Sequence, residues 1–225
     1  MSQIESPIII PQHVVITINT AMWSNATPDN LTATFSLIER AIELRLQALS
    51  FYFYTPPARP HLHTITHTLF QTFIHALALN HLQGLNVKIC FIGDDHHLEP
   101  DLLQQVQALQ KQATDKSAFT LGLIYGYNGR ADIAQAANRL VGTNQPLSDA
   151  VIATALEQHF YTHDLPTPDL LIYTGGERRL AHLLTWQASY AEFLFIDTDG
   201  LQLDGNRFYQ TLLDFNLRQR RFGSG

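Results

Sequence analysis

The chain has 225 residues, of which 45% are hydrophobic and 15% charged, and its formal net charge is −6 at pH 7. This composition excludes a disordered chain, and the length suits a single domain over residues 1–225 with a substantial core. The acidic balance argues against a general nucleic-acid binder, so we expect no nucleic-acid partner.

Targeting and membrane segments are not visible in the sequence. Residues Met1 to Pro7 carry no basic region of a signal peptide, and Ile8-Ile9-Ile10 is too short for its apolar core. No apolar run reaches the length of a membrane span. The single cysteine, Cys90, excludes an internal disulfide and lies in an apolar run, which predicts a buried thiol. We therefore expect a cytoplasmic protein.

Apolar runs alternate with helical periodicities along the chain. In chain order we expect a strand at Val14–Ile18, a helix at Thr32–Leu49, a strand at Phe51–Tyr54, a helix at His61–Leu82, a strand at Val87–Ile92, a helix at Pro100–Lys116, a strand at Phe119–Tyr125, helices at Ala131–Val141 and Leu147–Phe160, a strand at Leu170–Ile172, a helix from Arg178 to near Glu192, a buried strand at Phe193–Ile196, and a helix at Arg207–Arg221. This order predicts an α/β fold, with a mainly parallel sheet of about six strands and helices on both faces.

Ligands of such sheets bind beyond the carboxyl ends of the strands. The residues expected there are Asn19, Thr55, Gly93, Asn128, Thr174 and Asp197.

Thr174-Gly175-Gly176-Glu177 breaks the fifth strand at that edge. Paired glycines allow backbone amides to approach a ligand closely, and an expected helix begins beside them with Arg178 and Arg179. Amides, a helix N-terminus and two guanidiniums indicate an anion site, with phosphate as the best candidate. From spacing alone, a β-α-β unit with solvated arginines explains the pattern equally well.

The stretch from Pro166 to Thr198 also resembles the cis-prenyltransferases, whose type member is undecaprenyl diphosphate synthase. The matching segments there are PDLLI, TGGE, RRL, LLTWQASYAE and Phe195-Ile196-Asp197, and elsewhere His13–Ile16, Ile92–Asp94, Asn128–Arg130 and Arg220–Gly223. The resemblance implies condensation of isopentenyl diphosphate onto an allylic diphosphate such as farnesyl diphosphate, with Mg²⁺. It also implies a dimer and a hydrophobic tunnel for the growing chain.

The chain departs from the family where the metal and the allylic diphosphate would bind. The family has an aspartate at the end of the first strand, followed by a Gly-Asn-Gly-Arg-Trp loop. This chain has Asn19-Thr20-Ala21-Met22-Trp23 there, and a neutral amide is a poor Mg²⁺ ligand. Tyr173 replaces an arginine and Ala181 replaces a serine of the motif around Thr-Gly-Gly-Glu.

Other family residues are retained, and the resemblance assigns roles to them. The degenerate catalytic position is Asn19. Diphosphate-binding roles are implied for Arg59, Gly175, Gly176, Arg179, Arg221 and Gly223, and a metal-binding role for Glu192. In the family the C-terminal motif that matches Arg221-Phe222-Gly223 reaches into the partner's active site.

The losses can be weighed against catalysis. Each missing charge-assisted contact costs about 1.5–3 kcal/mol, and each tenfold in rate is about 1.4 kcal/mol. Several contacts and the metal ligand are absent together, so we expect no ordinary activity from this chain alone and regard a Mg²⁺ site as doubtful.

Three functions remain open. The chain could pair with an intact family member as a non-catalytic subunit, bind an isoprenoid diphosphate or lipid without turning it over, or still transfer prenyl groups with an altered site. A drifting duplicate without a selected role is the bland alternative.

Several smaller patterns have ordinary structural interpretations. His63 and His67 are four apart, but without a third ligand nearby in sequence a solvated helix start is the better interpretation. His96 and His97 are expected to be exposed. Sequence signatures of an α/β-hydrolase, a dinucleotide site and a P-loop are absent. An aromatic set could line a lipid tunnel or form ordinary core, and this is left open: Tyr52, Phe53, Tyr54, Leu69 and Phe73.

Overall fold

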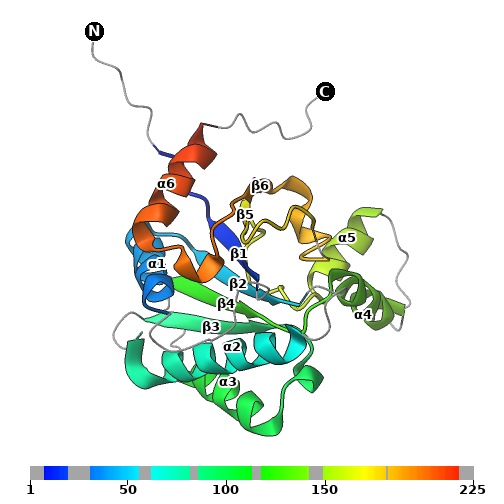
Figure 1. Cartoon of the computed structure of the whole chain (residues 1–225). Helices are drawn as coiled ribbons and strands as arrows, with labels where there is room; N and C mark the ends of the chain where they lie inside the picture. The colour runs from blue at the N-terminus through cyan, green and yellow to red at the C-terminus, as the bar shows by residue number, and fades with distance from the viewer. Residues whose placement is uncertain are drawn as a thin grey trace.

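Six parallel strands form one sheet at the centre of the molecule (Figure 1). The structure, a computed structural model, describes residues 8–19, 31–55, 62–81, 86–112, 118–141, 149–180 and 182–217. The strands are β1 His13–Asn19, β2 Ala48–Tyr54, β3 Val87–Ile92, β4 Phe119–Ile124, β5 Leu170–Tyr173 and β6 Glu192–Phe195, in the spatial order β3-β4-β2-β1-β5-β6. The expected α/β fold with a parallel sheet is confirmed.

β1 and β2 lie in the interior of the sheet because both of their faces are apolar. All seven residues of β1 are buried, and Val14 lies in register with Leu49 of β2 and Leu170 of β5. Near-continuous apolar runs are typical of parallel strands that are covered on both sides. The carboxyl ends of β1, β2 and β5 therefore lie side by side, at what is called below the carboxyl edge of the sheet.

Four helices cover one face of the sheet. They are α1 Thr32–Glu43, α2 His63–Ala76, α3 Pro100–Gln112 and α6 Gly205–Asn216, and their apolar residues form one core with β1, β2 and β4. A single π-helical turn, Leu77–His81, continues α2. In Figure 1, α1 and α6 lie side by side, and α2 and α3 run together below β3. None of the helices among the described residues is long and apolar enough to cross a membrane.

The other face is covered differently from what the sequence predicts. The helix expected from Arg178 to Glu192 does not form in the residues described there. His182 (φ 63°) and Leu184 (φ 43°) adopt left-handed backbone conformations, which an α-helix of L-residues cannot contain. Leu183 and Leu184 are both buried against Val15 and Tyr173, while Leu180 is 48% exposed. Only a short 3₁₀ helix, Gln187–Tyr190, follows.

Two further boundaries differ for physical reasons. α1 ends at Glu43 rather than Leu49, because Arg45 turns the chain with φ 61° and the amide of Ala48 then donates to the carbonyl of Gln12. β6 is an edge strand rather than a buried one, and Phe195 is 44% exposed.

Two further helices, α4 Gly129–Val141 and α5 Asp149–Glu157, form a small separate core beside the sheet. Phe160 belongs to this core, and its ring contacts that of Trp186. Cys90 is buried as expected, and burial raises the pKa of its thiol to about 11.

Candidate functional site

The candidate site is built at the carboxyl edge shared by β1, β2 and β5. Asn19 closes β1 in register with Tyr54 of β2, and Thr174 follows β5. Thr174 makes two hydrogen bonds with Thr17 of β1. Its amide donates to the hydroxyl of Thr17 at 3.0 Å, and its own hydroxyl donates to the Thr17 carbonyl. The expected Thr174–Glu177 loop therefore leaves β5 at a fixed point beside the end of β1.

The two glycines of this loop are required by its backbone. Gly175 (φ 66°) and Gly176 (φ 74°) are both left-handed, and a Cβ on Gly175 would lie 2.9 Å from Cβ of Asn19. Their amides donate to the carbonyls of Thr198 at 3.0 Å and Ile196 at 3.4 Å. The sequence pattern predicts these two amides as donors to an anion. In the structure they already donate to carbonyls of the segment that follows β6.

Asn19 holds the loop against the strand. Its side-chain Nδ2–H donates to the carbonyl of Gly175 at 3.1 Å, and the residue is only 8% exposed. An ionised aspartate has no proton to donate and would face that carbonyl oxygen with a negative charge. The asparagine therefore serves a structural contact that the family's aspartate cannot make.

The charges of the loop are paired within it. The Arg179 Nε–H donates to a carboxylate oxygen of Glu177 at 3.0 Å, and this bond raises the pKa of the guanidinium. The Arg179 side chain is 85% exposed and that of Glu177 is 16% exposed. A guanidinium has five N–H donors, so the bond to Glu177 still leaves Arg179 able to bind an anion in solution.

Tyr173, which replaces a family arginine, is a neutral wall of the site. The residue is 1% exposed, and its hydroxyl donates to the Leu180 carbonyl at 3.0 Å. Burial raises the pKa of the Tyr173 phenol, with added repulsion from Glu177 and Tyr54, so it carries no charge at neutral pH. A guanidinium in its place would supply positive charge where this chain has an aromatic ring.

A small cavity of about 200 Å³ adjoins this edge at the ends of β2 and β4. Tyrosine side chains dominate its walls, and His63 from the start of α2 completes them: Tyr52, Phe53, Tyr54, Thr55, His63, Tyr125, Gly126 and Tyr127. The His67 ring, one turn along α2, lies 3.0 Å from the Tyr125 hydroxyl, whereas His63 is exposed, as expected at a solvated helix start.

A Mg²⁺ site at Asn19 does not fit the described residues. Glu192, the implied metal ligand, is the first residue of β6. It pairs with Leu170 of β5, which in turn pairs with Val14 of β1. Asn19 lies five residues further along β1, about 16 Å away at roughly 3.3 Å per residue. The two side chains cannot share an ion within one chain, and the amide of Asn19 already donates to Gly175.

Other acidic groups lie along the same edge. Asp94, Asp95 and His96 follow β3 with ligand atoms within 4.8 Å of one another. Three strand spacings separate β3 from β1, about 14 Å at roughly 4.8 Å each, so this cluster does not replace the lost aspartate. Asp197 is closer to the loop, because its Oδ1 would lie 3.9 Å from a Cβ on Gly176. As expected, His96 is exposed.

Sequence reasoning missed a buried carboxylate behind the site. Asp132, in the first turn of α4, is 1% exposed and accepts hydrogen bonds from the Tyr127 hydroxyl (2.9 Å), the Gln135 side chain (3.1 Å) and the Tyr161 amide (3.1 Å). Gln187 approaches it at 3.4 Å. Two of these partners, Tyr161 and Gln187, lie 29 and 55 residues away along the chain, so no local pattern could reveal the whole network. The sequence signal for Asp132 is limited to its being an acidic residue shortly after Asn128-Gly129-Arg130.

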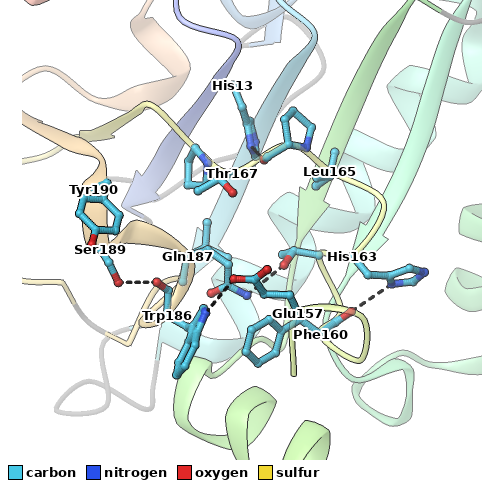
Figure 2. Close-up of a pocket in the computed structure, with 14 residues that line it drawn as sticks. His13, Glu157, Phe160, His163, Leu165, Thr167, Trp186, Gln187, Ser189 and Tyr190 are labelled. Atoms are coloured by element: carbon cyan, nitrogen blue, oxygen red, sulfur yellow. Dashed lines mark hydrogen bonds between the residues drawn. The ribbon is translucent and has the colours of Figure 1, made fainter. Parts of the chain in front are cut away.

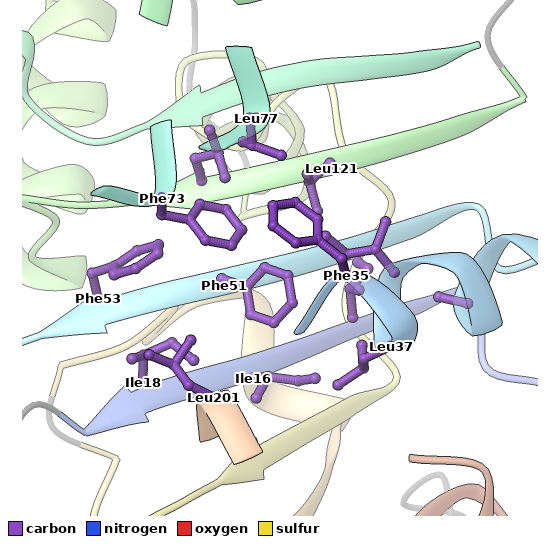
Figure 3. Close-up of a cluster of buried hydrophobic side chains, with 14 of the residues drawn as sticks. Ile16, Ile18, Phe35, Leu37, Phe51, Phe53, Phe73, Leu77, Leu121 and Leu201 are labelled. Carbon is purple, nitrogen blue, oxygen red and sulfur yellow. The ribbon is translucent and has the colours of Figure 1, made fainter. Parts of the chain in front are cut away.

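The aromatic set left open between tunnel and core is mostly core. Phe53 is 2% exposed, and Leu69 and Phe73 have no exposed surface. Figure 3 shows Phe35, Phe51, Phe53 and Phe73 close together between the helices and the sheet. Tyr52 and Tyr54 instead face the small cavity.

A larger cavity of about 510 Å³ lies at the other end of β1, where the strand begins at His13 (Figure 2). In its wall the indole N–H of Trp186 donates to the Glu157 carboxylate at 3.4 Å. His13 is held between the Pro166 carbonyl and the Ser50 hydroxyl, and burial lowers the pKa of its imidazole to about 4.

Three implied binding residues, Arg59, Arg221 and Gly223, lie outside the described residues, as does Ala181.

Comparisons with known proteins agree with this architecture. Residues 28–223 match the family model described as "Putative undecaprenyl diphosphate synthase". A ditrans,polycis-undecaprenyl-diphosphate synthase of Coxiella burnetii, (2E,6E)-farnesyl-diphosphate specific, is 30% identical over 96% of this chain and 97% of its own. The enzyme of the same description from Pseudomonas syringae pv. tomato is 30% identical over 99% of this chain and 95% of its own.

Two solved structures share the fold. Lavandulyl diphosphate synthase from Lavandula x intermedia, in complex with dimethylallyl diphosphate, superposes with a TM-score of 0.81 at 23% identity, covering 95% of this chain and 98% of that one. A probable undecaprenyl diphosphate synthase from Campylobacter jejuni gives a TM-score of 0.77 at 23% identity, covering 96% and 100%.

Proposed function

The chain belongs to the undecaprenyl diphosphate synthase family, the cis-prenyltransferases, and from this premise we propose that it binds a prenyl diphosphate but does not condense isoprenoid units by itself. It acts as a subunit of a dimer, and an intact family member supplies the metal site that this chain lacks.

The observation that carries the proposal is the hydrogen bond from Asn19 to Gly175. The end of β1 holds a neutral amide that donates to the loop at 3.1 Å, where the family resemblance implies a metal-binding carboxylate. Mg²⁺ prefers carboxylate oxygens and waters, and a diphosphate leaving group without its cation leaves with more uncompensated charge. The bond also gives the asparagine a structural role, since it holds the Thr174–Glu177 loop against β1.

Binding of the diphosphate itself rests on cations that remain. Arg179 projects into solvent beside the Thr174–Glu177 loop, and the family resemblance adds Arg59 and Arg221. We propose these three, with Gly175, Gly176 and Gly223, as the diphosphate-binding residues. Guanidiniums suit this role because they bind phosphate oxygens in pairs.

The outer strand of the sheet, β6, supports dimer formation. β6 pairs with β5 along one side and forms the end of the six-stranded sheet, and Tyr190 (71% exposed) and Phe195 (44% exposed) flank it. Aromatic side chains on an open strand edge favour association with another chain. The proposed partner is an intact family member, toward which the Arg221-Phe222-Gly223 motif would extend, and a homodimer is the alternative if the chain is active by itself.

An active prenyltransferase with an altered site is the second candidate. The relatives named as synthases are 30% identical over nearly their whole length, which favours it. Asp197, whose Oδ1 would lie 3.9 Å from a Cβ on Gly176, is then the candidate for the replacement carboxylate.

A mixing experiment tests the subunit role. The purified protein would be combined with an intact homologue from the same organism, and complex formation measured by size-exclusion chromatography with light scattering. Labelled isopentenyl diphosphate, farnesyl diphosphate and Mg²⁺ would then report product rate and chain length. The proposal expects a stable complex whose rate or product length differs from that of the homologue alone. A homologue that neither binds this chain nor changes its products would refute the subunit role.

A further inference from the structure

The cavity of about 510 Å³ at the amino end of β1 has no part in the proposed function (Figure 2). His13 in its wall and Asn19 at the candidate site are the two ends of β1, about 20 Å apart at roughly 3.3 Å per residue. The cavity volume falls within the range of about 300–1,000 Å³ that is usual for small-molecule sites. A ligand held here would therefore be separate from a prenyl diphosphate at the Thr174–Glu177 loop.

The wall of this cavity is negatively charged. Among the described residues that line it, Glu157 carries the only permanent charge, and there is no lysine or arginine. His13 is neutral at pH 7, because burial lowers the pKa of its imidazole to about 4. An anionic ligand would meet the Glu157 carboxylate without a fixed positive charge to offset it, whereas a cation would find its counter-charge there.

The side-chain N–H groups of the described wall already have acceptors within the protein. The indole N–H of Trp186 donates to Glu157 at 3.4 Å, and the side-chain amide of Gln187 donates to a threonine hydroxyl at 2.9 Å. Both ring nitrogens of His13 and of His163 contact protein oxygens. A carboxylate offers about four acceptor positions, and the indole uses one. The wall therefore suits a ligand that donates hydrogen bonds.

Two aromatic rings form a corner beside the carboxylate. The ring centroids of Phe160 and Trp186 are 6.0 Å apart and their planes are inclined by 54°. Trp186 is only partly buried and lines the cavity, and its indole N–H points at Glu157. Cations bind over aromatic faces within about 6 Å of the ring centroid, and most strongly over tryptophan. A cation in this corner meets an aromatic ring and a carboxylate together.

We propose that this cavity binds a small organic ammonium ion, which donates hydrogen bonds to the Glu157 carboxylate and places its positive charge against Trp186. The apolar body of such an amine would contact Phe160 and Leu184, which also line the cavity. Negative charge, remaining acceptor positions and an aromatic corner all favour this ligand class. The inference does not depend on prenyl diphosphate binding at the carboxyl edge of the sheet.

Tryptophan fluorescence of the full chain tests the proposal, because Trp186 is one of two tryptophans and Trp23→Phe leaves it as the sole reporter. The probes are cyclohexylammonium, cyclohexanol and cyclohexanecarboxylate, which share a ring and differ in the charge of the head group. We expect cyclohexylammonium to bind at least about tenfold more tightly than cyclohexanol, and the carboxylate to bind most weakly. Binding of either other probe as tightly as the amine, or no binding of the amine, would overturn the proposal.

Variants locate the site. Glu157→Gln keeps an acceptor for the Trp186 indole and removes the negative charge, so the affinity for cyclohexylammonium should fall at least about tenfold while that for cyclohexanol changes little. The matched control is Glu39→Gln, which makes the same change of charge at an exposed position of α1. Trp186→Leu, measured by isothermal titration calorimetry, should also weaken binding of the amine. Equal effects of Glu157→Gln and Glu39→Gln, or an unchanged affinity in Trp186→Leu, would contradict the assignment.

Discussion

Asn19 shows at the scale of one residue how a family position can be reused. The family resemblance implies a carboxylate at this position, and only the structure shows the Asn19 amide donating to the Gly175 carbonyl. Local sequence could predict the glycine turn, because left-handed backbone needs glycine. It could not predict where the two glycine amides point, because their acceptors, Thr198 and Ile196, come after the next strand.

Removal of the Asn19 hydrogen bond should lower the stability of the fold. Asn19→Asp replaces a donor by a carboxylate that faces the Gly175 carbonyl, so we expect a loss of about 1–3 kcal/mol in the free energy of unfolding at pH 7. Urea denaturation measures it, and Asn206→Asp in the first turn of α6 provides the exposed control. A variant as stable as the parent would show that the bond does not hold the loop.

His13 makes a prediction about pH. Burial lowers the pKa of the His13 imidazole from 6.5 to about 4, so the folded state excludes a proton that the unfolded chain takes up below pH 6.5. The stability from the neutral ring is therefore complete above pH 6.5 and is lost as pH falls toward 4, by roughly 3 kcal/mol. Urea denaturation at pH 7, 5.5 and 4.5 should show this decline, and His13→Asn should remove most of it. An identical pH dependence in the variant would contradict the assignment.

Among the elements, sequence patterns predict each strand of the described residues and fail at one helix. β3 has the predicted bounds, because an apolar run between turns is a local signal. The segment from Leu180 to Ala188 also has helical spacing, but Leu183 and Leu184 pack against the second face of the sheet in a segment with two left-handed residues. Tertiary packing overrode the periodicity, and no residue within the segment signals that outcome.

Asp132 ties several elements together, and its removal should be costly. Asp132→Ala leaves the Tyr127 hydroxyl, the Gln135 side chain and the Tyr161 amide without their acceptor. We expect a loss of at least about 3 kcal/mol in the free energy of unfolding, measured by urea denaturation. Asp101→Ala is the matched control, since Asp101 occupies the first turn of α3 but is exposed. Equal effects of the two substitutions would mean that the network contributes nothing.

At the scale of the whole molecule, the open edge of the sheet is the main unexplained surface of the single chain. The proposed dimer covers it. Phe195→Glu places a charge on that edge, and we expect the self-association constant, or the affinity for an intact homologue, to fall at least about tenfold, since burying an unpaired charge opposes association. Sedimentation analysis measures the change. Leu217→Glu, at an 84% exposed position beyond α6, is the control and should leave association unchanged. Equal effects would place the interface elsewhere.

Condensation of isoprenoid units by this chain alone separates the two candidate functions. The most direct test is incorporation of labelled isopentenyl diphosphate by the purified protein alone, with Mg²⁺ and either dimethylallyl or farnesyl diphosphate, beside an intact family member as positive control. We expect no product above background with either allylic substrate, under conditions in which the control produces labelled polyprenyl diphosphate. Product that depends on this protein and on Mg²⁺ would refute the proposed loss of catalysis and show that another carboxylate, with Asp197 the first to test, takes the role that the family resemblance implies for position 19.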